Sequence, residues 1–258
     1  MSTTISERWK DYTSPSGANT IIGTLKVLQS LYSTQLANRR DILVHLPSSY
    51  GSSDRRYPVI YMHDAQNLFD RATSFVGEVW HVDSALTALA YQGLEAIVVG
   101  LPHAGDARIH EYNPFDRGDD YLAFIVDTVR PLINQDFRTL TERTHTGIIG
   151  SSLGGLISLY AFFRHPQVFG LAGALSPALW VQRGRIYEYV RTAPFSPGRI
   201  YVDNGSREGN ALGIYDSLRD KGYRPDLDIK YVREEGGMHS EADWARRLPD
   251  ALRFLLSG

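Results

Sequence analysis

The sequence contains no cysteine, which excludes disulfides, thiolate metal sites and a cysteine nucleophile. An excess of either charge is also missing, because 27 basic and 29 acidic residues give a formal net charge of −2. A chain so close to neutral has no general electrostatic attraction to nucleic acid or to an anionic membrane. We therefore expect neither of these partners.

Long hydrophobic runs are absent as well. The longest apolar stretches, such as Ala96–Leu101, have the length of a strand and fall far short of a bilayer span. The N-terminal segment contains no apolar run of signal-peptide length. These absences predict a protein without a membrane-spanning segment, located in the cytoplasm.

What the sequence does contain is enough apolar material for a sizeable core, since 43% of its 258 residues are hydrophobic. No repeat, charge run or low-complexity tract divides the chain. We expect one domain over residues 1–258, with residues 1–20 as a loosely ordered N-terminal arm.

Apolar runs alternate with segments of helical periodicity along the chain, which is typical of an α/β fold. Several runs are nearly all apolar and suit parallel strands buried on both faces, whereas the first two alternate and suit an antiparallel edge. The expected strands are Thr24–Tyr32, Asp41–Leu46, Pro58–His63, Ala96–Leu101, Thr146–Gly150, Leu171–Leu175, Ile200–Asp203 and Asp228–Arg233. The expected helices are Val79–Tyr91, Tyr121–Gln135, Leu153–Arg164, Ala211–Lys221 and Glu241–Leu256, the last broken or kinked at Pro249. This pattern predicts an eight-stranded, mostly parallel sheet with helices on both faces and no room for a large lid domain.

The strongest chemical signal is the segment Gly150-Ser151-Ser152-Leu153-Gly154-Gly155, which contains the pattern G-x-S-x-G. It follows an expected strand and runs directly into an expected helix, the context in which this pattern forms the nucleophile turn of an α/β-hydrolase. Ser152, the central serine, is therefore the expected nucleophile. The N–H of Leu153, at the start of the helix, is an expected donor to the oxyanion.

A nucleophilic serine needs a base and an acid that orients the base, and in this fold the acid precedes the histidine in the chain. His239 lies in the loop before the last expected helix and is the one histidine in a suitable downstream position. Glu208 and Asp203 both qualify as the acid. Glu208 is favoured because it lies beyond the strand end in a glycine-flanked loop, and Asp203 remains the alternative.

The second oxyanion donor should follow the third expected strand, where we assign the N–H of Gln66. His63 and Asp64 lie just before it. Because neighbouring strand residues point to opposite faces and no third ligand is evident, we expect no metal site there.

Four segments together resemble the putative-esterase family, which includes enterochelin esterase, esterase D and the feruloyl esterases. They are Tyr61–Asp70, Gly150–Gly155, Leu175-Ser176-Pro177 and Gly237-Met238-His239. The resemblance runs from about residue 25 to the C-terminus. It implies an α/β-hydrolase fold, Ser152 as nucleophile, His239 as base, the acid within Gly205–Glu208, and chemistry without a metal or organic cofactor.

The sequence departs from that family at two positions. Ala65 stands where the family usually has glycine, which affects the oxyanion loop, and Leu153 replaces a commoner methionine. The second change should be harmless, since only the N–H of residue 153 is used.

Substrate preference should reside in the loops beyond the strand ends. Arg108, Tyr112 and Trp180 could line a pocket for an aromatic or polar acyl group with a negative end. In the alternative, Trp180 packs its own loop and Arg108 pairs with Glu111 or Asp106.

These features predict a serine carboxylic-ester hydrolase that acts on a small-molecule ester through an acyl-enzyme intermediate. The same three residues would also serve acyl transfer to an alcohol or sugar acceptor. A third, non-enzymatic alternative is a member of the fold that only binds a ligand.

Overall fold

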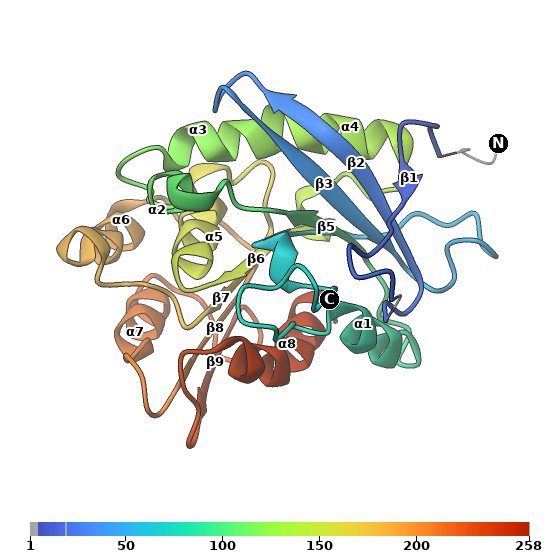
Figure 1. Cartoon of the computed structure of the whole chain (residues 1–258). Helices are drawn as coiled ribbons and strands as arrows, with labels where there is room; N and C mark the ends of the chain where they lie inside the picture. Colours follow the sequence, from blue (N-terminus) through green and yellow to red (C-terminus); the bar gives the residue numbers. More distant parts are fainter. Residues whose placement is uncertain (1–4, 19, 258) are drawn as a thin grey trace.

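A single mixed sheet forms the centre of the computed structural model, which describes residues 5–18 and 20–257 (Figure 1). Its strand order is β1-β2-β3-β5-β4-β6-β7-β8-β9. The pairs β1–β2, β2–β3 and β3–β5 are antiparallel, and all the following pairs in this order are parallel. The strands are β1 (Lys10–Asp11), β2 (Thr24–Ser33), β3 (Asn38–Leu46), β4 (Val59–His63), β5 (Ile97–Leu101), β6 (Thr146–Ser151), β7 (Leu171–Leu175), β8 (Arg199–Gly205) and β9 (Ile229–Glu234). All eight expected strands are present within a few residues of their expected bounds.

The expected count of eight strands is wrong by one, because β1 adds a two-residue strand at the edge. Lys10 pairs with Val27 of β2, and the neighbouring Trp9 is 4% exposed. The Trp9 indole also donates a hydrogen bond of 2.8 Å to Asp136. A two-residue strand is too short to give a sequence pattern, yet it ties residues 9–11 of the expected arm to the sheet.

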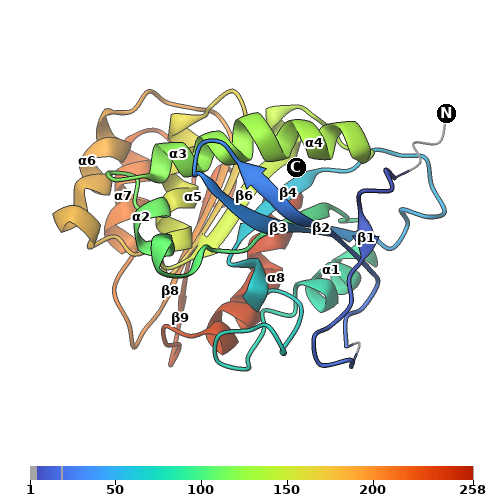
Figure 2. The same cartoon turned by 45° about the horizontal axis from the view of Figure 1, so that its top comes forward.

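Helices cover both faces of the sheet (Figure 2). Val82 and Leu248 belong to a core cluster on one face, and Leu156 and Ile214 belong to a second cluster on the other. The helices are α1 (Val82–Ala90), α2 (Arg108–Glu111), α3 (Gly118–Ala123), a π-helical segment (Phe124–Val129), α4 (Arg130–Asp136), α5 (Leu153–Arg164), α6 (Arg185–Thr192), α7 (Leu212–Asp220) and α8 (Glu241–Leu256). None of the helices in the described residues is long and apolar enough to cross a bilayer.

Of the break or kink expected at Pro249, the break is wrong, since α8 continues from Glu241 to Leu256. Proline lacks the N–H that would bond the carbonyl of Ala245, which costs a helix about 3 kcal/mol or more. Leu248 and Leu252 on either side of it are fully buried against the sheet. Tertiary packing of this face therefore holds the helix together through the proline.

A crevice at the carboxyl ends of β4 and β6 follows from the topology. These strands are parallel neighbours, but the chain leaves β4 towards α1 on one face and leaves β6 into α5 on the other. Ligands of open α/β sheets bind where neighbouring connections diverge in this way.

Candidate active site

The turn between β6 and α5 holds Ser152 in a strained backbone conformation. Its φ of 55° and ψ of −119° lie in a region that residues with a Cβ rarely adopt. Both Ser151 and Ser152 line a cavity of about 490 Å³, but Ser151 is only 4% exposed whereas Ser152 is partly exposed. The local geometry is thus the expected strand, sharp turn and helix, with Ser152 rather than Ser151 at its tip.

Gly150 has no room for a side chain. A Cβ there would lie 2.7 Å from Cδ2 of His63 and 2.8 Å from the carbonyl carbon of Gly154. We expect Gly150→Ala to lower the unfolding free energy by about 2–3 kcal/mol through this overlap, and the Tm by about 5–10 °C. Thermal unfolding of Gly51→Ala is the matched control, because a Cβ at Gly51 meets nothing within 4 Å. Equal Tm values for the two variants would contradict the tight turn.

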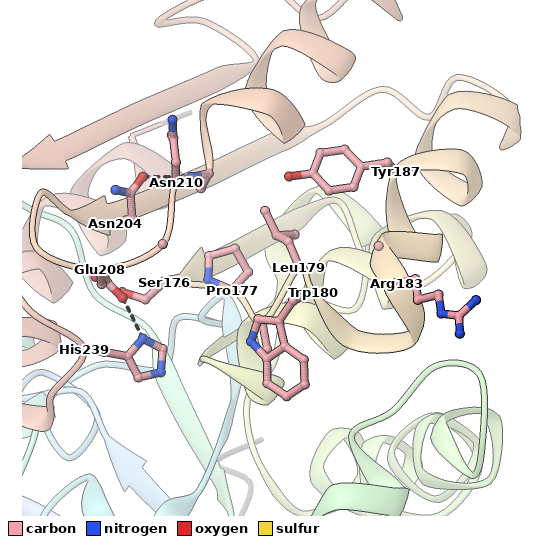
Figure 3. Close-up of a pocket in the computed structure, with 14 residues that line it drawn as sticks. Ser176, Pro177, Leu179, Trp180, Arg183, Tyr187, Asn204, Glu208, Asn210 and His239 are labelled. Atoms are coloured by element: carbon pink, nitrogen blue, oxygen red, sulfur yellow. Dashed lines mark hydrogen bonds and ion pairs between the residues drawn. The ribbon is translucent and has the colours of Figure 1, made fainter.

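His239 and Glu208 form a close pair beyond the strand ends (Figure 3). Nδ1 of His239 lies 2.6 Å from Oε2 of Glu208. An ionised carboxylate only accepts hydrogen bonds, so Nδ1 carries the proton and Nε2 is left as the acceptor. His239 and Ser152 line the same cavity, although in the described part of the chain no hydrogen bond joins their side chains. Such contacts often tighten only when substrate is bound.

The carboxylate form of Glu208 is stabilised by its neighbours. Burial alone would raise the pKa of this carboxyl group, but hydrogen bonds from His239, from the hydroxyl of Ser176 and from the N–H of Gly205 outweigh burial and lower it. Glu208 is therefore ionised around neutral pH, as the orienting acid of a histidine must be.

Asp203, the alternative acid, pairs with Arg247 rather than with His239. It is fully buried, and its Oδ1 accepts a 3.0 Å hydrogen bond from the N–H of Ser176. Its Oδ2 lies 3.0 Å from Nε of Arg247 as an ion pair without hydrogen-bond geometry. Burial raises the pKa of Asp203 to about 7 against the opposing charge of Arg247. The structure thus brings Glu208, not Asp203, to His239.

The backbone N–H groups of Gln66 and Leu153 lack hydrogen-bond partners in the described part of the chain. Gln66 lies in a 3₁₀ turn, Ala65–Asn67, which follows Asp64 in the left-handed region, and Leu153 begins α5. Gln66 also lines the cavity of Ser152, and Leu153 directly follows Ser152 in the chain.

The methyl group of Ala65, where glycine was expected from the resemblance, points into the core. Ala65 is 1% exposed and belongs to the cluster beneath α1 and α8. A Cβ on Gly100 of the neighbouring strand would lie only 2.9 Å from the Ala65 methyl. Glycine at position 100 therefore makes room for alanine at position 65.

The three expected pocket residues have different environments. Arg108 lines the Ser152 cavity, but its guanidinium makes two 2.8 Å hydrogen bonds to Asp64, not to Glu111 or Asp106. Trp180 is 75% exposed and lines a second cavity of about 480 Å³, on which His239 and Glu208 also border (Figure 3). The expectation for Tyr112 is wrong: it is fully buried beneath Arg108 and lines neither cavity.

His63 and Asp64 do not form a metal site together. The carboxylate of Asp64 is bound to Arg108, whereas the imidazole of His63 contacts Tyr121 at 2.7 Å and Ser158 at 3.1 Å. Burial lowers the pKa of His63 to about 3, which keeps the ring neutral. Over the described ranges, no cluster of three or more histidine or carboxylate side chains could hold a metal ion.

Sequence reasoning missed several residues of the site. Ser176 contacts Glu208 directly, and His103 lines the Ser152 cavity with a buried Nδ1 that lacks a partner in the described residues. Leu179 and Tyr187 line the second cavity with Trp180. The Leu175-Ser176-Pro177 segment contributes to the family resemblance, but the resemblance assigns no role to its serine.

Comparisons with known proteins identify the family and the fold of the chain. A model of the putative esterase family matches residues 33–255. The protein YbbA of Bacillus subtilis (strain 168) is 28% identical over 254 residues, which cover 88% of this chain and 96% of YbbA. The siderophore triacetylfusarinine C esterase of Aspergillus fumigatus is 32% identical over 136 residues, covering 48% of this chain and 44% of that enzyme.

Solved structures share the fold at low sequence identity. A ferulic acid esterase superposes with a TM-score of 0.70 at 22% identity, covering 90% of this chain and 98% of its own. The ferric enterobactin esterase of Salmonella typhimurium gives 0.75 at 21% identity, covering 93% and 60%. The fold is that of the α/β-hydrolases, and the chain belongs to the putative esterase family as a carboxylic ester hydrolase.

Proposed function

We propose that Ser152, His239 and Glu208 form a catalytic triad that hydrolyses small-molecule carboxylic esters through an acyl-enzyme. The observation that supports this most strongly is the 2.6 Å contact of His239 with Glu208 at the border of the cavity that Ser152 lines. Nδ1 is then protonated and held by the carboxylate, so Nε2 is free to take a proton from the serine.

In the first half of the reaction, Oγ of Ser152 attacks the ester carbonyl carbon while its proton passes to Nε2 of His239. The electron pair of the carbonyl bond moves onto the carbonyl oxygen, which then accepts hydrogen bonds from the N–H groups of Leu153 and Gln66. Collapse of this intermediate breaks the bond to the alcohol oxygen, which leaves with the proton from Nε2. The acyl group remains on Ser152.

The second half uses water in place of the serine. Water attacks the acyl carbon as His239 removes its proton, and the new intermediate collapses to the free acid. Oγ of Ser152 recovers its proton from Nε2, so one ester and one water give one acid and one alcohol.

A fluorophosphonate probe tests the nucleophile directly, since it phosphonylates an activated serine. We expect mass spectrometry of the digested protein to find one adduct, on the peptide that contains Ser152, with parallel loss of p-nitrophenyl acetate hydrolysis. A protein that neither reacts with the probe nor cleaves the ester would contradict the proposal.

The substrate class is tested with a panel of esters. Because relatives are named as siderophore and feruloyl esterases, the panel contains catecholate-siderophore, feruloyl and acetylated-sugar esters beside simple p-nitrophenyl esters. Adding a sugar or alcohol acceptor and analysing the products separates hydrolysis from acyl transfer, which uses the same triad. Free acid as the main product in the presence of acceptor is the result expected here.

A further inference from the structure

A buried polar cluster lies behind the carboxylate of Glu208. Ser176, directly after β7, is 3% exposed and sits between Glu208 and two side chains of α8. These are Trp244, 6% exposed, and Arg247, 4% exposed. Three separate elements therefore meet at one hydroxyl group.

The direction of the hydroxyl proton follows from its partners. Nε1 of Trp244 lies 2.9 Å from Oγ of Ser176, and Nη2 of Arg247 lies 2.7 Å from it. Both groups can only donate hydrogen bonds, so the serine oxygen must be the acceptor in both. Its own proton is then left for Oε1 of Glu208 at 2.7 Å, an oxygen that can only accept.

This arrangement fixes both oxygens of the carboxylate. Oε1 of Glu208 accepts from Ser176 and from the N–H of Gly205 at 2.5 Å. Oε2 is left to face Nδ1 of His239. The carboxylate plane is thus set by donors on the side away from the histidine.

The cluster includes features that cost folding free energy. Arg247 is a buried cation, which needs Asp203 at 3.0 Å and Glu234 at 2.8 Å to balance its charge. Ser176 has a φ of 42°, a conformation that is unfavourable for residues with a Cβ. Strain and buried charge gathered at one contact are typical of functional sites rather than of ordinary core packing.

We propose that Ser176 is a positioning residue for Glu208, its hydroxyl proton directed to that carboxylate by Arg247 and Trp244. The inference rests on the proposed triad. Ser176 does not touch substrate in this role. It holds Glu208 so that Oε2 keeps the Nδ1 proton of His239 in place while Nε2 exchanges protons with Ser152.

The test removes the hydroxyl in two ways that differ in backbone strain. Ser176→Ala keeps the unfavourable φ, whereas Ser176→Gly relieves it because glycine tolerates positive φ. If the hydroxyl matters for positioning, both variants should lose about ten- to hundredfold in kcat with little change in KM. The low-field proton resonance of Nδ1–H in His239 should also shift or disappear in both.

Ser196→Ala is the matched control. Ser196 is 4% exposed and its Oγ accepts a 2.9 Å hydrogen bond from Arg143. It lies before the amino end of β8, whereas Ser152 follows the carboxyl end of the parallel strand β6. We expect this variant to lose stability while kcat and the His239 resonance stay as in the wild type.

The outcomes separate this inference from the proposed triad. Suppose that Ser152→Ala is inactive but both Ser176 variants keep the wild-type kcat and an unchanged His239 resonance. This result would overturn the positioning role of Ser176 and leave the triad in place. A Ser176→Gly variant with full activity beside an impaired Ser176→Ala variant would also overturn it, since backbone strain would then explain the loss. Full activity of Ser152→Ala would instead overturn the triad itself.

Discussion

Replacement of Ser152 with alanine is expected to lower kcat for p-nitrophenyl acetate by about 10⁴- to 10⁶-fold. In the proposed mechanism alanine removes the oxygen that forms the acyl-enzyme but leaves the N–H groups of Leu153 and Gln66 as donors to the carbonyl oxygen. Residual activity should therefore reflect attack by water alone. The fluorophosphonate adduct should vanish from the same variant.

Ser151→Ala is the sharpest control for this result because it changes the neighbouring serine in the same turn. Ser151 is buried at the end of β6, and we expect its alanine variant to keep kcat within about tenfold of the wild type. The Tm of Ser152→Ala should stay close to that of the wild type, since alanine at φ 55° is no better suited than serine. Activity of Ser152→Ala within tenfold of the wild type would remove Ser152 as the nucleophile.

The nucleophile turn could be recognised from sequence because its determinants are local. A strand, two glycines and a helix lie within about twenty residues. A Cβ at Gly150 would lie 2.8 Å from Gly154 inside that segment, whereas a Cβ at Gly154 would meet His63 and Asp64 outside it. His239 could be found because the chain order of this fold leaves it as the one suitable histidine. Most strands could be located for a similar reason, since burial on both faces makes them continuously apolar.

For the acid, the sequence favours Glu208 by position but leaves Asp203 as the alternative. Asp203 lies within β8 and Glu208 three residues beyond its end, and composition does not tell which carboxylate reaches a histidine from another loop. The same holds for Arg108, the first residue of short helix α2, and Tyr112, which caps its C-terminus, because the two differ in burial. Such differences arise from tertiary packing, which local sequence does not encode.

Ser176 shows the limit most clearly. A serine before a proline has no chemical signature of its own, and its partner Arg247 is 71 positions away in the chain. The significance of this serine comes from three donors and acceptors that meet only in the folded protein. No spacing rule would have selected it.

Replacement of Glu208 with glutamine is expected to lower kcat by about 10³- to 10⁴-fold, with a smaller effect on KM. Glutamine has nearly the same shape but no charge to stabilise the imidazolium form of His239. Its amide can also present N–H to Nδ1, which would force the imidazole into the tautomer that cannot accept the proton of Ser152. Kinetics with p-nitrophenyl acetate measure both parameters.

Asp203→Asn distinguishes the two candidate acids. Asn retains an oxygen for the N–H of Ser176 but leaves Arg247 with less balancing charge, so the main expected effect is on stability. We expect kcat to fall by no more than about tenfold. A larger loss of kcat in Asp203→Asn than in Glu208→Gln would assign the acid to Asp203 instead.

The pH dependence of unfolding provides an independent readout for Asp203. Burial raises its pKa in the native protein to about 7, so between about pH 4 and pH 7 the native state holds a proton that the unfolded chain has released. The contribution of Asp203 to the unfolding free energy is complete below about pH 4 and is lost as the pH rises through about 7. Asparagine does not titrate, so urea unfolding of Asp203→Asn should show a smaller fall in stability across this interval than the wild type. Glu208→Gln should still have a lower kcat than Asp203→Asn, because Glu208 is the one of these two carboxylates that contacts His239.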